Sequence, residues 1–251
     1  MLAATRRELL LERLRQDRRI VAKDIAVELG LSEDSIRRDL RELAAEGLLT
    51  RVYGGAVPAS PATADYASRT LIASASKQRV ASAAAALVQP GSIVILDGGT
   101  TTLAVVQHLS RSLDCTVVTH SPTVASALLD HKAEILLIGG RLFKHSAVTS
   151  GAAAAESAGR ISADLFLLGV TGIHPIAGLT TGDADEAAMK RTLASRAAET
   201  YVLGSVEKIG AASPHQVLGF DDVAGLVLDV DGDAATIREL RAMGTRIIDA
   251  R

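Results

Sequence analysis

The stretch Ser32–Leu43, SEDSIRRDLREL, decides the fold of the N-terminal part of this chain. Ser32 is a residue type that caps helix N-termini, because its side-chain oxygen accepts hydrogen bonds from free backbone N–H groups. Ile36, Leu40 and Leu43 follow at i, i+4 and i+7 and form one apolar stripe. The stretch therefore predicts a capped helix that buries one narrow face.

The outer faces of this helix carry Arg37, Arg38 and Arg41, and Ser35 lies near its start. A short helix that presents arginines outward is what a reader of the DNA major groove needs. The alternative is a solvated helix with surface charge, and the stretch by itself leaves both interpretations open.

The residues before this stretch predict two more helices. Thr5 and Glu8 have the spacing of a capping box, and Leu10 and Leu14 follow on one side. A second helix is expected over residues 22–29, ended by Gly30 in the left-handed conformation. Two short helices joined by a turn of this length form a helix-turn-helix.

The segment after the third helix, LLTRVYGGAV at residues 48–57, predicts a β-hairpin with Gly54-Gly55 as its turn. A hairpin in this position is a wing, and Arg51 and Tyr53 are placed on it to touch phosphate or the minor groove. Three helices followed by a wing make DNA recognition the better account of Ser32–Leu43.

Residues 20–57 resemble the DNA-binding domain of the DeoR family of bacterial transcriptional regulators. The matching runs are Ser-x-x-Ser-Ile-Arg-Arg-Asp-Leu from Ser32 and Arg-x-Tyr-Gly-Gly-Ala from Arg51, with Ser35 where the family usually has Thr and Tyr53 where it often has His. The resemblance implies a repressor-like role at double-stranded operator DNA. The predicted DNA-contacting residues are Ser32, Ser35, Arg37, Arg38, Arg41, Arg51, Tyr53, Gly54 and Gly55.

The composition of the 251 residues, 48% apolar and 22% charged, is that of an ordinary globular protein. Cys115 is the single cysteine, so an intramolecular disulfide is impossible, and its apolar surroundings predict a buried side chain. The sequence contains neither an apolar run of membrane-spanning length nor a signal-peptide pattern at its start. We therefore expect a cytoplasmic protein that does not enter a membrane.

Residues 58–75 have little periodicity and predict a linker between a DNA-binding domain at 1–57 and a second domain at 76–251. The second domain alternates strand-like and helix-like segments, which predicts an α/β fold with a mostly parallel sheet covered on both faces. The expected strands are Ser92–Leu96, Thr116–Thr119, Ile135–Ile138, Leu165–Val170, Tyr201–Leu203, Gly225–Leu228 and Thr245–Ile248. The expected helices include Lys77–Val88, Thr101–Leu109, Val124–His131 and Asp185–Ala198.

Ligands of such sheets bind beyond the carboxyl ends of the strands. The loop Asp97-Gly98-Gly99-Thr100-Thr101-Thr102 leaves one expected strand and enters a helix, so its glycines, hydroxyls and free N–H groups suit a phosphate or another anion. No Gly-Lys-Ser/Thr follows, so nucleotide hydrolysis is not indicated. A tight turn with a capping threonine is the plainer alternative.

Other expected strand ends carry His120-Ser121, Gly140-Arg141 and Lys208. Glu186 and Lys190 follow the run GLTT (178–181) with i, i+4 spacing, which predicts either a surface ion pair or contacts to a charged ligand. Together these residues predict a polar pocket for an anion.

Residues 76–251 also resemble the DeoR-family sensor domain, which is similar in fold to ribose-5-phosphate isomerase and the coenzyme A transferases. The matching runs are DGGTTT, VVTHS, IGGR, GLTT, EAAMKR and EKIG. The resemblance implies that the domain binds a phosphorylated sugar or related metabolite and alters operator binding. The implied effector-binding residues are Asp97, Gly98, Gly99, Thr100, Thr101, Thr102, His120, Ser121, Gly140, Arg141, Glu186, Lys190 and Lys208.

Two departures from the family pattern bear on the effector. His120 stands where Asn is common, and Ser205-Val206-Glu207-Lys208 replaces Asp-Ser-Ser-Lys. A carboxylate repels a phosphate, so we expect either that Glu207 points away from the ligand or that the ligand differs.

Two other functions stay open. In the first, the domain is an isomerase- or transferase-like enzyme, and its acid–base candidates are Asp97, Asp183, Asp185 and His120. In the second, the domain has lost its ligand and only mediates assembly. The preferred interpretation is a non-enzymatic regulator without cofactor or metal, which acts as a homo-oligomer, a dimer or a tetramer.

Overall fold

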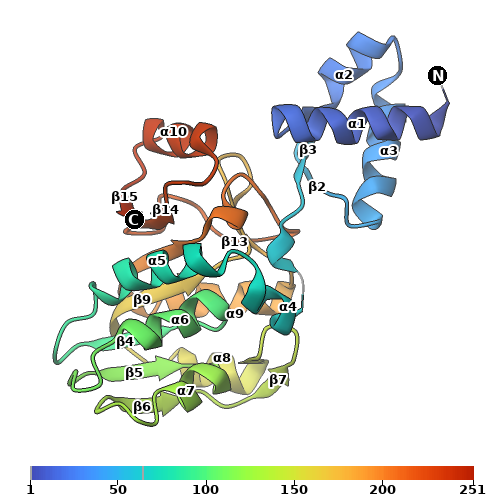
Figure 1. The fold of residues 1–251 in the computed structure, drawn as a ribbon. Helices are drawn as coiled ribbons and strands as arrows, with labels where there is room; N and C mark the ends of the chain where they lie inside the picture. Colours follow the sequence, from blue (N-terminus) through green and yellow to red (C-terminus); the bar gives the residue numbers. More distant parts are fainter. Residues whose placement is uncertain (1, 64) are drawn as a thin grey trace.

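The computed structural model describes residues 2–63 and 65–251. A small N-terminal unit of three helices and a short sheet stands beside a larger α/β unit, and the chain passes from one to the other through the residues that follow strand β3 (Figure 1). The two termini lie in different units (Figure 1).

The N-terminal unit is a winged helix-turn-helix. Its elements are α1 (Ala3–Asp17), β1 (Ile20–Val21), α2 (Ala22–Leu29), α3 (Glu33–Ala45), β2 (Leu49–Val52) and β3 (Gly55–Pro58). The strands form an antiparallel sheet in the order β1-β3-β2. Ile36, Leu40 and Leu43 of α3 are buried against Leu10 and Leu14 of α1, which confirms the predicted apolar stripe.

The predicted start of α3 is confirmed, and that of α1 is wrong. Ser32 precedes α3, and its Oγ accepts a hydrogen bond from the N–H of Ser35 at 3.2 Å. Helix α1 begins at Ala3, so Thr5 lies inside the first turn and is not a cap. Gly30 ends α2 at φ +63°, as expected.

The turn of the wing is displaced by one residue from the prediction. Val52 pairs with Gly55, so Tyr53-Gly54 form the two-residue turn and Gly55 begins β3. A Cβ on Gly55 would stand 1.7 Å from the carbonyl oxygen of Ile20, so this glycine allows β1 and β3 to approach each other. Gly55 is itself buried, and it lines the groove between α3 and the wing.

The predicted linker, residues 58–75, is partly helical. It contains a 3₁₀ turn η1 (Pro61–Thr63), helix α4 (Tyr66–Leu71) and the start of α5 (Ser74–Ala85); Ala64 lies outside the described residues. Asp65 caps α4 by accepting from the N–H of Ser68 at 2.9 Å. The six residues of α4 are too few to show an apolar period in the sequence.

All seven predicted strands of the second unit form one parallel sheet. They are β4 (Ile93–Leu96), β5 (Thr116–Thr119), β6 (Glu134–Leu137), β9 (Ala163–Gly169), β12 (Ala197–Gly204), β14 (Gly225–Asp229) and β15 (Ile247–Ala250). Their order is β15-β14-β12-β9-β4-β5-β6, and every neighbouring pair is parallel. The α/β prediction is confirmed.

Two apolar cores cover the two faces of this sheet. Alternate strand residues such as Val94 and Ile95 point to opposite faces. Helices α5, α6 (Thr100–His108) and α7 (Pro122–Ala127) pack on one face, and α8 (Ala152–Ala158), α9 (Ala184–Ala194) and α10 (Ala234–Ala242) pack on the other. Cys115 is buried in the first core, as expected.

Short antiparallel segments complete the unit. Strands β7 (Arg141–Phe143) and β8 (Val148–Ser150) pair as a hairpin, and β10 (Gly172–His174), β11 (Gly178–Thr181) and β13 (His215–Leu218) form a separate sheet. The run GLTT forms β11, and helix α9 follows it as expected. Throughout residues 2–63 and 65–251, the helices are too short or too polar for any of them to cross a bilayer.

Candidate functional site

The recognition helix α3 and the wing border one groove of about 180 Å³. Arg37 lines it from the helix, and Arg51, Tyr53 and Gly54 line it from the wing. The Tyr53 side chain is fully exposed at the tip. Arg37 also donates to Glu33 of its own helix at 2.6 Å, while Arg38 and Arg41 are exposed on α3. The fold thus gathers predicted cations of both elements on one surface.

A buried ion pair that the sequence prediction missed holds α3 on α1. Asp39 accepts from Arg6 with both carboxylate oxygens, one of them at 2.9 Å, and the side chains are only 2% and 8% exposed. Asp39 lies on the buried side of α3, next to Leu40. A carboxylate among apolar positions was the available signal, because buried charges need partners.

The second site lies where the strand order of the parallel sheet reverses. The chain runs outward through β4, β5 and β6, and then returns to the other side of β4 to form β9. Asp97 follows β4 and Val170 follows β9, so their loops meet at this switch point. Open α/β sheets bind ligands at such points.

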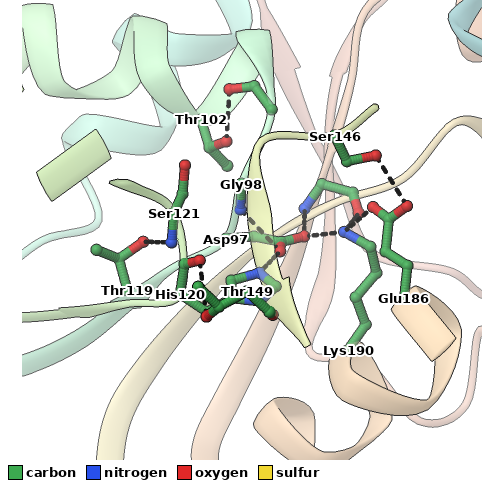
Figure 2. A network of polar contacts seen from close by, with 12 residues as sticks. Asp97, Gly98, Thr102, Thr119, His120, Ser121, Ser146, Thr149, Glu186 and Lys190 are labelled. Atoms are coloured by element: carbon green, nitrogen blue, oxygen red, sulfur yellow. Dashed lines mark hydrogen bonds and ion pairs between the residues drawn. The ribbon is translucent and has the colours of Figure 1, made fainter. Parts of the chain in front are cut away.

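Asp97 is the centre of a buried polar network at the switch point (Figure 2). Its Oδ1 accepts from His120 Nε2 at 2.8 Å and from the N–H of Gly98 at 2.8 Å. Its Oδ2 accepts from Lys190 Nζ and from the N–H of Gly169 at 2.8 Å. Asp97 has no exposed surface, so it holds the loops around the pocket in place and is not itself open to a ligand.

The network continues from Lys190 to the start of helix α9. Lys190 Nζ lies 3.2 Å from Glu186 Oε1 and donates to the Gly169 carbonyl at 2.9 Å, and Ser146 Oγ donates to Glu186 Oε2 at 3.0 Å (Figure 2). The predicted pair of Glu186 and Lys190 therefore exists, but it is buried and not on the surface. Asp183 caps α9 by accepting from the N–H of Glu186 at 2.9 Å.

The opposite charges in this network keep each other ionised. Burial alone would raise the pKa of the Asp97 carboxyl, but Lys190 and His120 outweigh it and hold this pKa well below its usual range. Burial likewise acts to lower the pKa of Lys190, but Asp97 and Glu186 raise it above its usual value. Asp97 is thus a fixed anion whose oxygens are already occupied, which does not suit a general base.

His120 is a structural hydrogen-bonding residue. It is fully buried, and its two ring nitrogens contact the Asp97 carboxylate and, at 3.0 Å, the carbonyl of Thr149. Ser121 is also buried, and its Oγ donates to the Ala147 carbonyl at 3.1 Å. These two predicted residues lie behind the pocket and join the β5 end to the β7–β8 hairpin.

A small cavity of about 30 Å³ opens above the network. The predicted residues that line it are Gly98, Gly99, Thr100, Thr101, Thr102, Glu186, Lys190 and Lys208. Gly99 has φ +114° and turns the chain into α6, whose N-terminal N–H groups face the loop. Backbone N–H groups, hydroxyls and cations around one cavity suit a small anion.

Lys208 is the cation most open to titration there. Its Nζ donates to Thr101 Oγ1 at 2.9 Å. Burial lowers the pKa of Lys208 to about 8; Glu207 opposes the shift, and the cations Lys77, Arg69 and Lys190 add to it. An anion in the cavity would favour its charged form.

Three charged residues of the cavity wall were not predicted to contact a ligand: Arg69, Lys77 and Glu207. Arg69 comes from α4, inside the predicted linker, and Lys77 comes from α5. Glu207 lines the cavity, so of the two expectations for this residue, that it points away from the ligand or that the ligand differs, the structure contradicts the first. An arginine in a weakly periodic segment, such as Arg69, gives too little signal to place it in a site.

Gly140 and Arg141 do not line the cavity. Gly140 packs against Ser150 and Ala154, and Arg141 is exposed at the start of β7. Asp185, an acid–base candidate, is exposed at the start of α9. Gly140 and Arg141 lie outside this cavity because the β7–β8 hairpin follows β6 and carries the chain away from the strand end.

A second cavity of about 410 Å³ lies between the two units of the protein. Its walls include Gly47 and Thr50 of the winged unit, and it shares Arg69, Thr171 and Glu186 with the small cavity. Thr50 Oγ1 also donates to the Ala212 carbonyl at 2.8 Å, only four residues beyond Lys208. The pocket wall is therefore hydrogen-bonded to the wing through a short stretch of chain.

Family models match both units of the chain. A DeoR-like helix-turn-helix domain matches residues 6–62, and a DeoR C-terminal sensor domain matches residues 72–230.

Individual relatives match along most of their length. The putative aga operon transcriptional repressor of Escherichia coli O157:H7 is 32% identical over 97% of this chain and 92% of its own. The glycerol-3-phosphate regulon repressor of Escherichia coli K12 is 28% identical over 80% of this chain and 81% of its own. Among solved structures, ribose 5-phosphate isomerase A of Methanocaldococcus jannaschii covers 54% of each chain at 16% identity, with a TM-score of 0.41.

Proposed function

The chain belongs to the DeoR family, and we propose that it is a DNA-binding transcriptional repressor of carbohydrate metabolism genes, controlled by a phosphorylated sugar or a related metabolite. The observation that carries the proposal is the joining of a winged helix-turn-helix to an anion-type cavity at the sheet switch point. Its relatives named as repressors of the aga operon and the glycerol-3-phosphate regulon support this reading.

Operator recognition is assigned to α3 and the wing. In this proposal Arg37, Arg38 and Arg41 enter the major groove, and Arg51 and Tyr53 contact the backbone or the minor groove from the wing. The chain acts as a homo-oligomer whose paired recognition helices meet repeated or palindromic half-sites.

Effector recognition is assigned to the small cavity. The phosphate lies on the N-terminus of α6 with Lys208 and Arg69, and the rest of the molecule extends toward the larger cavity through their shared wall. Binding there displaces the segment from Lys208 to Ala212 and thereby the hydrogen bond to Thr50 on the wing. The effector shifts operator affinity because it binds more tightly to the arrangement in which this hydrogen bond to the wing is displaced.

Operator binding by variants tests the DNA half of the proposal. Replacing Arg37 or Arg38 by Ala is expected to weaken binding to a duplex selected from a random pool by about 1–3 kcal/mol, because each loses a base contact. Replacing Arg51 by Ala should weaken binding to all duplexes similarly and reduce the salt slope by about one. Fluorescence anisotropy at several salt concentrations measures both. Unchanged affinity in all three variants would contradict the assignment.

The pH dependence of effector binding tests the other half. A phosphate needs the charged form of Lys208, whose pKa is about 8. We therefore expect affinity for phosphorylated sugars to be constant near pH 7 and to fall above pH 8, by up to about tenfold per pH unit.

The control for this pH effect is Lys208→Arg, which stays charged and should give a flat profile. Lys208→Met should weaken binding at every pH. Calorimetric titration with a panel of phosphorylated sugars, with release of the selected duplex as a second readout, measures these changes. Operator binding without any sugar-phosphate binding would instead support a sensor unit that only mediates assembly.

A further inference from the structure

Glu207 is a carboxylate in the wall of a cavity otherwise suited to an anion. Its side chain is 8% exposed and lines the cavity together with Lys77 and Lys208. Its Oε1 accepts from Ser205 Oγ at 2.8 Å and lies 3.8 Å from Lys77 Nζ. This anion favours the charged form of Lys208, but it repels a bare phosphate directly, because like charges repel.

The second oxygen of Glu207 is an unused acceptor. Oε2 is buried and has no hydrogen-bond partner among residues 2–63 and 65–251. Buried polar atoms are nearly always hydrogen-bonded, so such an atom in a ligand cavity indicates a ligand group that completes it. Within the same described residues, the Nε of Arg69, which lines this cavity too, also lacks a hydrogen-bond partner.

Hydrogen bonding to Lys77 does not use the carboxylate. Lys77 Nζ already donates to the carbonyls of Arg69 and Ile72, and its separation from Glu207 exceeds hydrogen-bond length. Its ammonium is therefore held by α4 without Glu207. The cavity thus offers a free donor on Arg69 and a free acceptor on Glu207.

We infer that Glu207 is a specificity-determining residue that accepts a hydrogen bond from a hydroxyl or ammonium group carried by the effector near its phosphate. The inference rests on the proposed function and adds the class of ligand. Arg69 and Lys208 bind the anion, and Glu207 selects molecules with a donor beside it. A site built to pair with a ligand donor discriminates strongly against analogues that lack it.

Three phosphate esters of similar length test this selection: glycerol 3-phosphate with two hydroxyls, ethanolamine phosphate with an ammonium, and propyl phosphate with neither. Calorimetric titration of the full chain should show at least one donor-bearing ester binding at least about tenfold more tightly than propyl phosphate. In Glu207→Ala this ratio should fall to about one, because the acceptor is gone. In Glu207→Gln the preference for hydroxyls should persist and the preference for ammonium should be lost, which identifies the donor.

Glu156→Gln, an exposed glutamate on α8, is the matched control and should keep the native ratio. A merely structural role of Glu207 would weaken all three esters equally, so an unchanged ratio in Glu207→Ala overturns the inference while leaving the anion site intact. Failure of the native chain to bind any of the three esters would contradict both the inference and the proposed anion site.

Discussion

Replacing Asp97 by Ala is expected to lower the free energy of unfolding by about 3–5 kcal/mol, because it leaves Lys190 and His120 buried without their common anion. The substitution also removes the acceptor of the N–H groups of Gly98 and Gly169, at the point where β4 and β9 meet. Denaturant unfolding followed by circular dichroism measures the change.

The control for Asp97 is Asp130→Ala at an exposed position, which should change stability by less than about 0.5 kcal/mol. The loss of stability at acid pH gives a second readout. The pKa of Asp97 lies below the unfolded value of about 3.9, so its contribution is complete above that value and disappears as pH falls through the lower folded pKa. Asp97→Asn should reduce this acid-dependent loss. If Asp97→Ala were as stable as Asp130→Ala, Asp97 would not be the anion that stabilises the buried network.

Replacing Asp39 by Ala is expected to destabilise the winged unit by a similar amount, about 3–5 kcal/mol, because Arg6 would be left as an unpaired buried charge. Helix α3 would lose its polar attachment to α1, so affinity for the selected duplex should fall while affinity for phosphorylated sugars persists. Thermal unfolding and the two binding assays measure these effects separately.

Asp34→Ala, on the same helix but exposed, is the matched control and should cost at most about 1 kcal/mol through the helix dipole. The double variant Arg6→Met with Asp39→Leu should recover the stability, because apolar side chains often replace a buried ion pair without loss. If Asp39→Ala kept native duplex affinity and stability, the pair would not anchor the recognition helix.

Local patterns in the sequence were sufficient for the recognition helix and the large sheet. The capped stretch from Ser32, the apolar stripe of α3 and the seven strands of the sheet were each predicted from contiguous residues and are observed. Predictions that depended on a single residue of register were less reliable. The wing turn is Tyr53-Gly54 because Gly55 must lie against Ile20, a contact between strands more than 30 residues apart in the chain.

The functional roles within the candidate pocket depended on long-range contacts. Motif residues of the loop 97–102 line the cavity, but Asp97 and His120 support it from beneath, and Gly140 and Arg141 lie elsewhere. Arg69 comes from a segment that shows no period in the sequence and reaches the cavity only through the docking of α4.

The sequence by itself determined a winged helix-turn-helix followed by a parallel α/β unit with a glycine-rich loop at a strand end, because helix caps, apolar periods and glycine-rich turns act over a few residues. Only the tertiary structure decided that Glu207 faces the cavity and that Lys190 is a buried partner of Asp97. The reason is physical: burial and charge pairing depend on which distant segments meet, and at the switch point β4, β9, α4, α9 and the turn after β12 bring those charges together.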